Sequence, residues 1–295
     1  MAYDFDLFVI GGGSGGVRSA RIASGHGARV AVAEERFWGG TCVNVGCVPK
    51  KIMVNAAEYG AWAEDAAAFG WSIETHGHDW AKLAAARDSE VARLSGIYGR
   101  LLGNAGVTSF DARATFLDAH TLDVGGKRVT AERIIIAVGG TASRLDIPGA
   151  ELGLISDDIF TLKALPKRVA VLGAGYIAVE FACILKGLGA EVTLVHRAPL
   201  PLRGFDEDIR SAAAEALVAQ GITCRADVSP TRIEAQGAAR LLHLSDGSAA
   251  EFDAVVCVSC SDPVRLLRLE RRGLSPEAAK ARIDSQAPLA EKVKK

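Results

Sequence analysis

The sequence has no excess of charge of either sign. Against 34 Lys and Arg residues stand 35 Asp and Glu residues, which gives a formal net charge of −1 over 295 residues. Proteins that bind nucleic acid or an anionic membrane through their overall charge carry a clear basic excess. The balance therefore predicts a protein with neither kind of partner.

Long hydrophobic runs are also absent. The longest, residues 134–138 and 169–172, are far shorter than the ~20 residues that cross a bilayer as a helix. The acidic Asp4 stands directly before the first strand-like run at Phe5, a pattern unlike a secretory signal peptide. We expect a cytoplasmic protein with no membrane span.

Cysteine is scarce, and a cytosolic chain of this length is not expected to use it for a structural disulfide framework. The six cysteines stand at positions 42, 47, 183, 224, 257 and 260. The last four lie in apolar runs and are predicted to be small buried hydrophobic residues. Cys42 and Cys47 lie among glycines and polar residues and need another explanation.

A glycine-rich turn follows the first predicted strand, residues 6–10, and precedes a predicted helix at 17–24 and a second strand at 29–33. Gly11, Gly13 and Gly16 occupy the positions of a GxGxxG fingerprint, which allows a tight turn, close approach of a pyrophosphate, and close packing of helix on strand. Glu34 ends the second strand, where a carboxylate can accept hydrogen bonds from ribose hydroxyls. The pattern predicts a dinucleotide site, with a glycine turn that binds nothing as the alternative.

The same pattern recurs later in the chain. Strand 168–172 leads into a second turn, followed by a predicted helix at 179–188 and a strand at 191–195. The second turn comprises Gly173, Ala174, Gly175, Tyr176, Ile177 and Ala178. No acid ends this second strand; instead Arg197 follows it, with Arg203 six residues later. Two guanidinium groups can bind a 2′-phosphate that a carboxylate would repel, which favours NADPH over NADH. Solvated surface arginines are the alternative.

The segment from Gly39 to Lys51, GGTCVNVGCVPKK, contains Cys42 and Cys47. It resembles the redox-active disulfide motif of the glutathione reductase family and its lipoamide dehydrogenase relatives. A metal site is the competing interpretation, but two thiols without a nearby histidine or a second pair supply too few ligands. The resemblance covers about residues 1–256.

This resemblance implies that NADPH reduces FAD and that FAD passes electrons to a Cys42–Cys47 disulfide. Cys47 would then lie next to the flavin, and Cys42 would exchange with glutathione disulfide. The resemblance also places Lys50 near the flavin, paired with Glu180, and Tyr176 as an aromatic gate where nicotinamide enters.

Further positions follow from the same resemblance. Ser14, Arg21 and Tyr98 match glutathione contacts, although Arg21 can equally be an exposed helix residue and Tyr98 a packing aromatic. Together with the arginine pair, they favour glutathione reductase over lipoamide dehydrogenase, which uses NAD. The predicted FAD site comprises Gly11, Gly13, Ser14, Gly16, Glu34, Gly40, Thr41 and Gly139.

The predicted fold is α/β with two Rossmann-like dinucleotide-binding domains, the first incomplete, and a short helical tail. We expect a FAD domain with the redox disulfide at 1–150, an NADPH domain at 151–256, and a tail of different origin at 257–295. The tail resembles part of dephospho-CoA kinase but lacks a phosphate-binding GxxxxGK[ST] loop.

The resemblance stops near residue 256, before the family's second FAD motif, its catalytic histidine–glutamate pair and its interface domain. A homodimer is therefore doubtful. Two functional hypotheses stay open: a working NADPH-dependent glutathione-disulfide reductase, or a catalytically inactive nucleotide-binding fragment or mis-joined chimera. In a mis-joined chain the join would lie near Cys257, and the spacing Cys257-x-x-Cys260 would then be an accident of that join. A redox or zinc role for this pair is the alternative.

Overall fold

The computed structural model describes residues 3–258. The chain divides into two compact units, Met1–Met53 with Ala81–Thr141 and Val54–Trp80 with Ala142–Lys295. Within the described residues, no helix combines the length and apolar character needed to cross a membrane.

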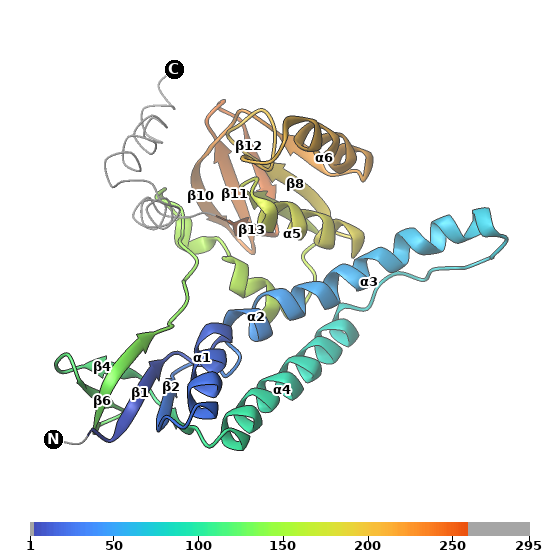
Figure 1. Ribbon diagram of the computed structural model, residues 1–295. Helices are drawn as coiled ribbons and strands as arrows, with labels where there is room; N and C mark the ends of the chain where they lie inside the picture. The colour runs from blue at the N-terminus through green and yellow to red at the C-terminus, as the bar shows by residue number, and fades with distance from the viewer. Residues whose placement is uncertain (1–2, 259–295) are drawn as a thin grey trace. The chain divides into compact units, whose positions relative to one another are not determined.

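The first unit is built on a six-stranded sheet with the order β3-β2-β1-β6-β5-β4 (Figure 1). Its strands are β1 (Phe5–Ile10), β2 (Val30–Glu34), β3 (Thr108–Asp111), β4 (Ala114–Phe116), β5 (Thr121–Val124) and β6 (Lys127–Ile136). β3, β2, β1 and β6 run parallel, whereas β5 and β4 complete the sheet in antiparallel pairs. The two strands predicted at 6–10 and 29–33 are thus present as β1 and β2.

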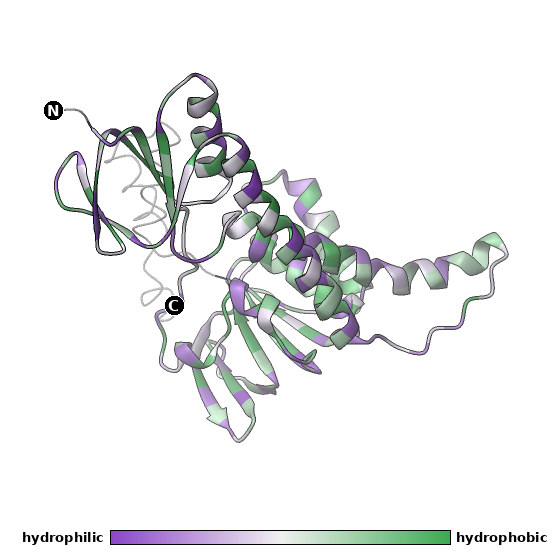
Figure 2. Cartoon of the chain, turned by 90° about the horizontal axis from the view of Figure 1, so that it is seen from below, coloured by the Kyte–Doolittle hydropathy of each residue, from purple (hydrophilic) through white to green (hydrophobic). Residues whose placement is uncertain are grey.

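Both faces of the central strand β1 are covered, as expected for a strand inside a parallel sheet. Because side chains alternate along a strand, Val9 packs into a cluster with Val17 of the helix α1 (Ser14–Gly25). Phe8 and Ile10 point to the opposite cluster, with residues of β2, β5 and β6. In Figure 2, much of this sheet has the colour of hydrophobic residues.

Three helices follow the first βαβ unit: α2 (Gly40–Asn44), α3 (Cys47–Asp65) and α4 (Trp80–Asn104), with the 3₁₀ turn η1 (Ala66–Phe69) after α3. α4 contacts the start of α3 through Arg87, whose guanidinium is almost fully buried and approaches the Met53 sulfur at 3.9 Å.

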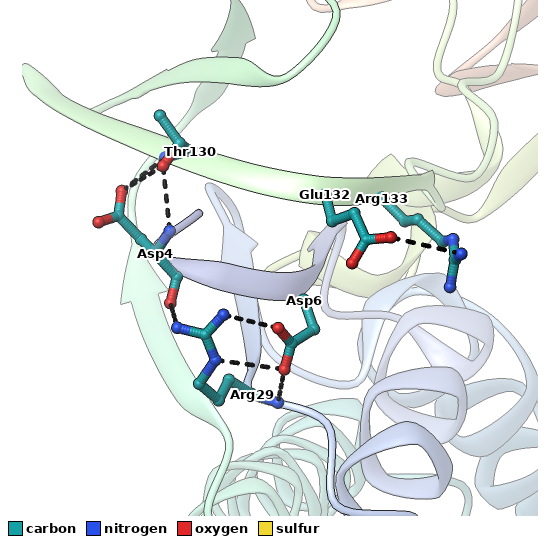
Figure 3. Close-up of polar contacts among 6 residues, drawn as sticks. All are labelled: Asp4, Asp6, Arg29, Thr130, Glu132 and Arg133. Carbon is teal, nitrogen blue, oxygen red and sulfur yellow. Dashed lines mark hydrogen bonds and ion pairs between the residues drawn. The ribbon is translucent and has the colours of Figure 1, made fainter. Parts of the chain in front are cut away.

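Polar contacts fasten the amino-terminal end of β1 to its neighbours (Figure 3). Asp6 forms an ion pair of 2.6 Å with Arg29, and Asp4 accepts hydrogen bonds from the backbone N–H and the hydroxyl of Thr130, each at 2.8 Å. The hydrogen bonds from Arg29 lower the pKa of the Asp6 carboxyl below its ordinary value. These contacts hold the register of β1 against β2 and β6.

The second unit contains a parallel sheet with the order β13-β7-β8-β9 and a three-stranded antiparallel sheet with the order β10-β11-β12. The parallel strands are β7 (Arg168–Leu172), β8 (Glu191–Val195), β9 (Thr223–Arg225) and β13 (Ala254–Cys257). The antiparallel strands are β10 (Pro230–Gln236), β11 (Ala239–Leu244) and β12 (Ala249–Phe252). Its helical elements are η2 (Ala150–Leu152), η3 (Ser156–Thr161), α5 (Tyr176–Gly187) and α6 (Glu207–Ala219).

One buried cluster joins the two sheets of this unit, with Leu172 and Val195 on one side and Ile233, Leu242 and Phe252 on the other. The second predicted strand–turn–helix–strand is present, with β7 and β8 at the expected residues and α5 beginning three residues earlier than expected. The α/β class with parallel sheets is thus confirmed. Residues 259–295, where the helical tail is expected, lie outside the described part of the chain.

Candidate nucleotide and disulfide site

The first glycine turn is too closely packed to hold side chains at its ends. Gly11 has a φ of +110°, and a Cβ there would lie 2.3 Å from the carbonyl oxygen of Ala137. A Cβ on Gly16 would lie 1.9 Å from the carbonyl oxygen of Gly11. In contrast, a Cβ on Gly13 would meet only Gly40, at 3.6 Å, so the turn leaves room in front of its second glycine.

The helix that leaves this turn begins without a capping side chain. Gly13 is the N-cap of α1, and the first backbone hydrogen bond runs from the N–H of Val17 to the carbonyl of Gly13 at 2.9 Å. The amides of Ser14, Gly15 and Gly16 precede it and have no acceptor within the helix. Uncapped amides at the positive end of a helix dipole suit a pyrophosphate.

Glu34 links the end of β2 to the turn. Its carboxylate accepts hydrogen bonds from the backbone N–H groups of Gly12 at 2.7 Å, Arg36 at 2.7 Å and Phe37 at 3.3 Å. A carboxylate has about four acceptor positions, so one remains for a ribose hydroxyl. Ribose binding by Glu34 stays a prediction. The hydrogen bonds to the turn give this side chain a structural role that the sequence did not indicate.

Two further segments lie against the same turn. Gly39 donates its N–H to the carbonyl of Gly12 at 2.9 Å, and Gly40, with a φ of +60°, is so close that a Cβ would lie 2.7 Å from the Cα of Gly13. Thr41 follows in α2 with an exposed side chain. On the other side, Ala137 donates its N–H to Ile10 at 2.8 Å, two residues before Gly139. The structure thus brings together the three segments that carry the predicted FAD residues.

The cysteine pair occupies two consecutive helices. Cys42 lies half-buried in α2, and Cys47 is the exposed first residue of α3. Asn44, between them, donates from its amide nitrogen to the carbonyls of Trp38 and Gly40, each at 3.0 Å. These contacts fix the segment that carries Cys42.

Sequence reasoning missed the residues that support this segment. The Ser95 hydroxyl of α4 also donates to the Trp38 carbonyl, at 2.9 Å, and the Trp38 indole donates to Asp111 at 2.7 Å. The position of Asn44 between the two cysteines was the one available signal. Ser95 and Asp111 are too distant in sequence to have given one.

Both cysteines are free thiols in this structure. Partial burial, a hydrogen bond with Cys47 and the proximity of that sulfur raise the pKa of Cys42 to about 11. Among the cysteines predicted to be buried, Cys257 is buried, whereas Cys183 and Cys224 are only half-buried; Cys260 lies outside the described residues. In residues 3–258 there is no group of three His, Cys, Asp or Glu side chains arranged to hold a metal.

Other predicted site residues lie on these elements. Ser14 and Arg21 are exposed on α1, and Tyr98 of α4 is half-buried against the cluster around Val9. Lys50 lies in the first turn of α3, in the first unit, and Glu180 lies on α5, in the second unit. Their pairing stays a prediction, as do the substrate contacts.

The second glycine turn repeats the features of the first. Gly173 has a φ of +128°, and a Cβ there would lie 2.6 Å from the carbonyl oxygen of Val258. Gly175 is the N-cap of α5, without a capping side chain, and a Cβ on it would have no neighbour within 4 Å. Ala178, at the third fingerprint position, is fully buried. Tyr176 is 62% exposed at the start of α5, followed by the half-buried Ile177.

The loop after β8 returns to this turn. Leu202 donates its N–H to the carbonyl of Ala174 at 2.7 Å. Arg203, the next residue, and Arg197 are both exposed on this loop. The structure therefore places the backbone beside Arg203 against the second glycine turn, as an interaction with a bound dinucleotide requires.

Comparison with known proteins agrees with this arrangement. Residues 5–286 match the model of the family described as pyridine nucleotide-disulphide oxidoreductase. The match continues beyond residue 256, and nothing in the comparisons supports the resemblance of the tail to dephospho-CoA kinase.

The chain is 48% identical over 257 residues to a glutathione reductase of Burkholderia cepacia, covering 87% of this chain and 57% of the relative. It is 46% identical to a glutathione reductase of Nostoc sp., and the match covers 75% of this chain and 48% of the relative. A thioredoxin reductase of Emiliania huxleyi is 40% identical, and the match covers 85% of this chain and 55% of that relative.

Among solved structures, the HOCl-induced flavoprotein disulfide reductase RclA from Escherichia coli matches with a TM-score of 0.77 at 27% identity, covering 86% of this chain and 56% of that one. The chain thus spans about half the length of the relatives it matches. On these matches, the chain belongs to the pyridine nucleotide-disulphide oxidoreductase family.

Proposed function

We propose that this chain binds FAD at the first glycine turn and NADPH at the second, and that it reduces glutathione disulfide through a Cys42–Cys47 disulfide. The observation that carries the proposal is the contact between the cysteine-bearing segment and the nucleotide turn. The N–H of Gly39 donates to the carbonyl of Gly12, and Asn44 fixes the segment that carries Cys42. A nucleotide on this turn would therefore lie in the same unit as the thiols.

The first turn fits FAD through backbone groups. The uncapped amides at the start of α1 suit the pyrophosphate, and the space in front of Gly13 admits its approach. The residues that would hold the cofactor are Gly11, Gly13, Ser14, Gly16, Glu34, Gly40, Thr41 and Gly139. When bound, FAD would accept a hydride from NADPH and supply the two electrons that reduce the disulfide.

The second turn fits NADPH by the same argument, with two arginines in addition. The residues that would hold the dinucleotide are Gly173, Gly175, Ile177 and Ala178, with Tyr176 over the nicotinamide entrance and Arg197 and Arg203 on the 2′-phosphate. Arg197 stands just after the end of β8, near the position where an acid would select NADH, and Arg203 follows six residues later in the same loop. Lys50 and Glu180 are proposed as a pair next to the flavin.

The thiols carry out the exchange with substrate. Once two electrons and two protons have converted the disulfide to two thiols, the Cys42 thiolate attacks one sulfur of glutathione disulfide and expels one glutathione. Cys47 then attacks the sulfur of Cys42, which re-forms the disulfide and releases the second glutathione.

Glutathione as the substrate is supported by the named glutathione reductases among the relatives, and by Ser14, Arg21 and Tyr98 as candidate contacts. Thioredoxin reductases are also among them, so a protein disulfide is the competing substrate. We further propose a FAD domain at 1–150, an NADPH domain at 151–256 and a cytoplasmic setting, each from the sequence.

A non-catalytic nucleotide-binding role is the second candidate. It is favoured by the Cys42 thiol, whose pKa of about 11 keeps the proton on the sulfur at neutral pH. A thiol is a far weaker nucleophile than a thiolate. In this alternative both nucleotide turns bind their ligands, but disulfide turnover does not follow.

An anaerobic titration with NADPH, followed by visible absorption, tests the proposal. We expect the flavin band to bleach and a long-wavelength thiolate-to-flavin band to develop. Cys42→Ser should keep that band and Cys47→Ser should lose it, since Cys47 is the thiol proposed beside the flavin. The wild-type chain should also oxidise NADPH steadily in the presence of glutathione disulfide, and neither variant should do so. A protein that binds FAD and NADPH without turnover would favour the second candidate, and one that cannot bind FAD would contradict the proposal.

A further inference from the structure

The loop between β8 and α6, residues 196–206, is held by a side chain from α6. Arg210 donates from Nε to the carbonyl of Pro201 at 2.8 Å and from Nη2 to the carbonyl of Leu200 at 3.1 Å. One guanidinium group thus binds two consecutive carbonyls of the loop. Planar, charged donors of this kind give short and directional hydrogen bonds.

The conformation of the loop depends on such support. Leu202 has a φ of +53°, in the left-handed region that a leucine rarely adopts. The N–H of Leu202 donates to the carbonyl of Ala174, and Arg210 donates to the carbonyls of the two residues before Leu202. Strained residues of this kind persist where surrounding contacts determine the backbone, and they occur at ligand-binding segments.

Arg203 follows Leu202 directly and points into solvent. Within the described residues, no hydrogen bond or ion pair holds its side chain. The direction in which it leaves the loop is therefore set by the backbone of Leu202 and Gly204, whose φ is +96°. Any change in that backbone moves the guanidinium that the proposed function assigns to the 2′-phosphate.

Arg210 is itself well fixed. Asp206 caps α6 by accepting a hydrogen bond from the N–H of Asp208 at 3.0 Å, and the N–H of Arg210 donates to the Asp206 carbonyl at 3.0 Å. Arg210 is half-buried, and its Nε and Nη2 donate to carbonyls of the loop. It therefore lies at the fixed base of the loop and not at its exposed tip.

We propose that Arg210 is a positioning residue that sets the preference for NADPH over NADH by holding Arg203 in the orientation that meets the 2′-phosphate. The inference rests on the proposed NADPH site. Preorganising a binding group saves the entropy of ordering it when the ligand arrives. The effect should therefore appear only with ligands that carry the 2′-phosphate.

The test compares binding of 2′,5′-ADP and of 5′-ADP to the full chain by calorimetry. Arg210→Met should weaken 2′,5′-ADP binding about tenfold and change 5′-ADP binding less than about twofold. Arg210→Lys keeps the charge but cannot bind both carbonyls in the same geometry, so it should resemble Arg210→Met. Arg232→Met is the matched control, because Arg232 is an exposed arginine on β10 that pairs with Glu234 at 3.3 Å. It should change neither ligand.

A double variant separates positioning from direct contact. If Arg210 acts through Arg203, Arg210→Met should have little further effect in an Arg203→Met background. An equal loss in both backgrounds would mean that Arg210 binds the phosphate itself, and equal weakening of both ligands would mean a general structural role; each overturns the inference. A wild-type chain without preference for 2′,5′-ADP would instead overturn the NADPH proposal, and this inference with it.

Discussion

The carboxylate of Glu34 accepts a hydrogen bond of 2.7 Å from the backbone N–H of Gly12. The last residue of β2 thus holds the middle of the first glycine turn, in addition to binding the two amides that follow it. The residue predicted to bind the ribose therefore also fixes the turn that would bind the pyrophosphate. Both functions act on the same ligand site.

Replacement of Glu34 by Gln should weaken FAD binding by about tenfold or more. The amide has one acceptor oxygen and a nitrogen that cannot accept, so either the N–H of Gly12 or the N–H groups of Arg36 and Phe37, which bond to different carboxylate oxygens, would lose their acceptor. The measurement is the dissociation constant of FAD after reconstitution. Glu35→Gln is the control, because Glu35 is the adjacent acid and forms an exposed ion pair with Arg113 at 3.1 Å. Equal affinity of the two variants would contradict the role of Glu34.

Two neighbouring glycines of the first turn should respond oppositely to alanine. Gly16→Ala would place a Cβ 1.9 Å from the Gly11 carbonyl and should destabilise the fold by about 1–3 kcal/mol or more. Gly15→Ala meets nothing within 4 Å and lies in α1, so it should stabilise by about 0.5–1 kcal/mol. Urea unfolding of both variants measures the difference. Similar midpoints would show that the turn tolerates a side chain at Gly16.

The sequence predicted the elements of both nucleotide turns because these depend on local patterns. The apolar strands, the glycine spacing and the helices that follow are contiguous in sequence, and β7 and β8 have the predicted bounds. The contacts that link the turn to other segments join distant residues. The bond from Ser95 to Trp38 spans 57 positions, and no pattern within a single strand or helix encodes it.

The properties of the cysteine pair also depend on contacts that the sequence pattern does not reveal. The motif indicated redox chemistry, but the protonation of Cys42 depends on burial and on the placement of Cys47 by the turn between α2 and α3. Likewise, the half-buried positions of Cys183 and Cys224 follow from the packing around α5 and β9, although apolar neighbours in sequence suggested full burial.

Alkylation of Cys42 should become faster when Cys47 is replaced by Ser. The sulfur of Cys47 contributes to the raised pKa of Cys42 by a hydrogen bond to the thiol and by its proximity, so its removal should lower that pKa from about 11. More thiolate is then present at a given pH. The pH profile of the iodoacetamide reaction, with modification at Cys42 located by mass spectrometry, measures the shift. An unchanged midpoint would assign the raised pKa to burial alone.

The stability of the fold should fall between about pH 9 and pH 11 through Cys257. Burial at 1% exposure raises the pKa of this thiol from 9.0 to about 11. In that interval the unfolded chain loses the proton and the folded chain keeps it, so the free energy of unfolding decreases as the pH rises. A difference of two pKa units corresponds to a loss of up to about 3 kcal/mol.

Cys257→Ala removes this titration, although the smaller side chain leaves a cavity and lowers stability at neutral pH. The comparison is therefore the slope of unfolding free energy against pH, not its absolute value. Between pH 9 and pH 11 the variant should lose less stability than the wild-type chain. Cys224→Ala, at a half-buried thiol, is the control and should leave more of the slope in place. Parallel curves for wild type and Cys257→Ala would show that other groups cause the alkaline loss.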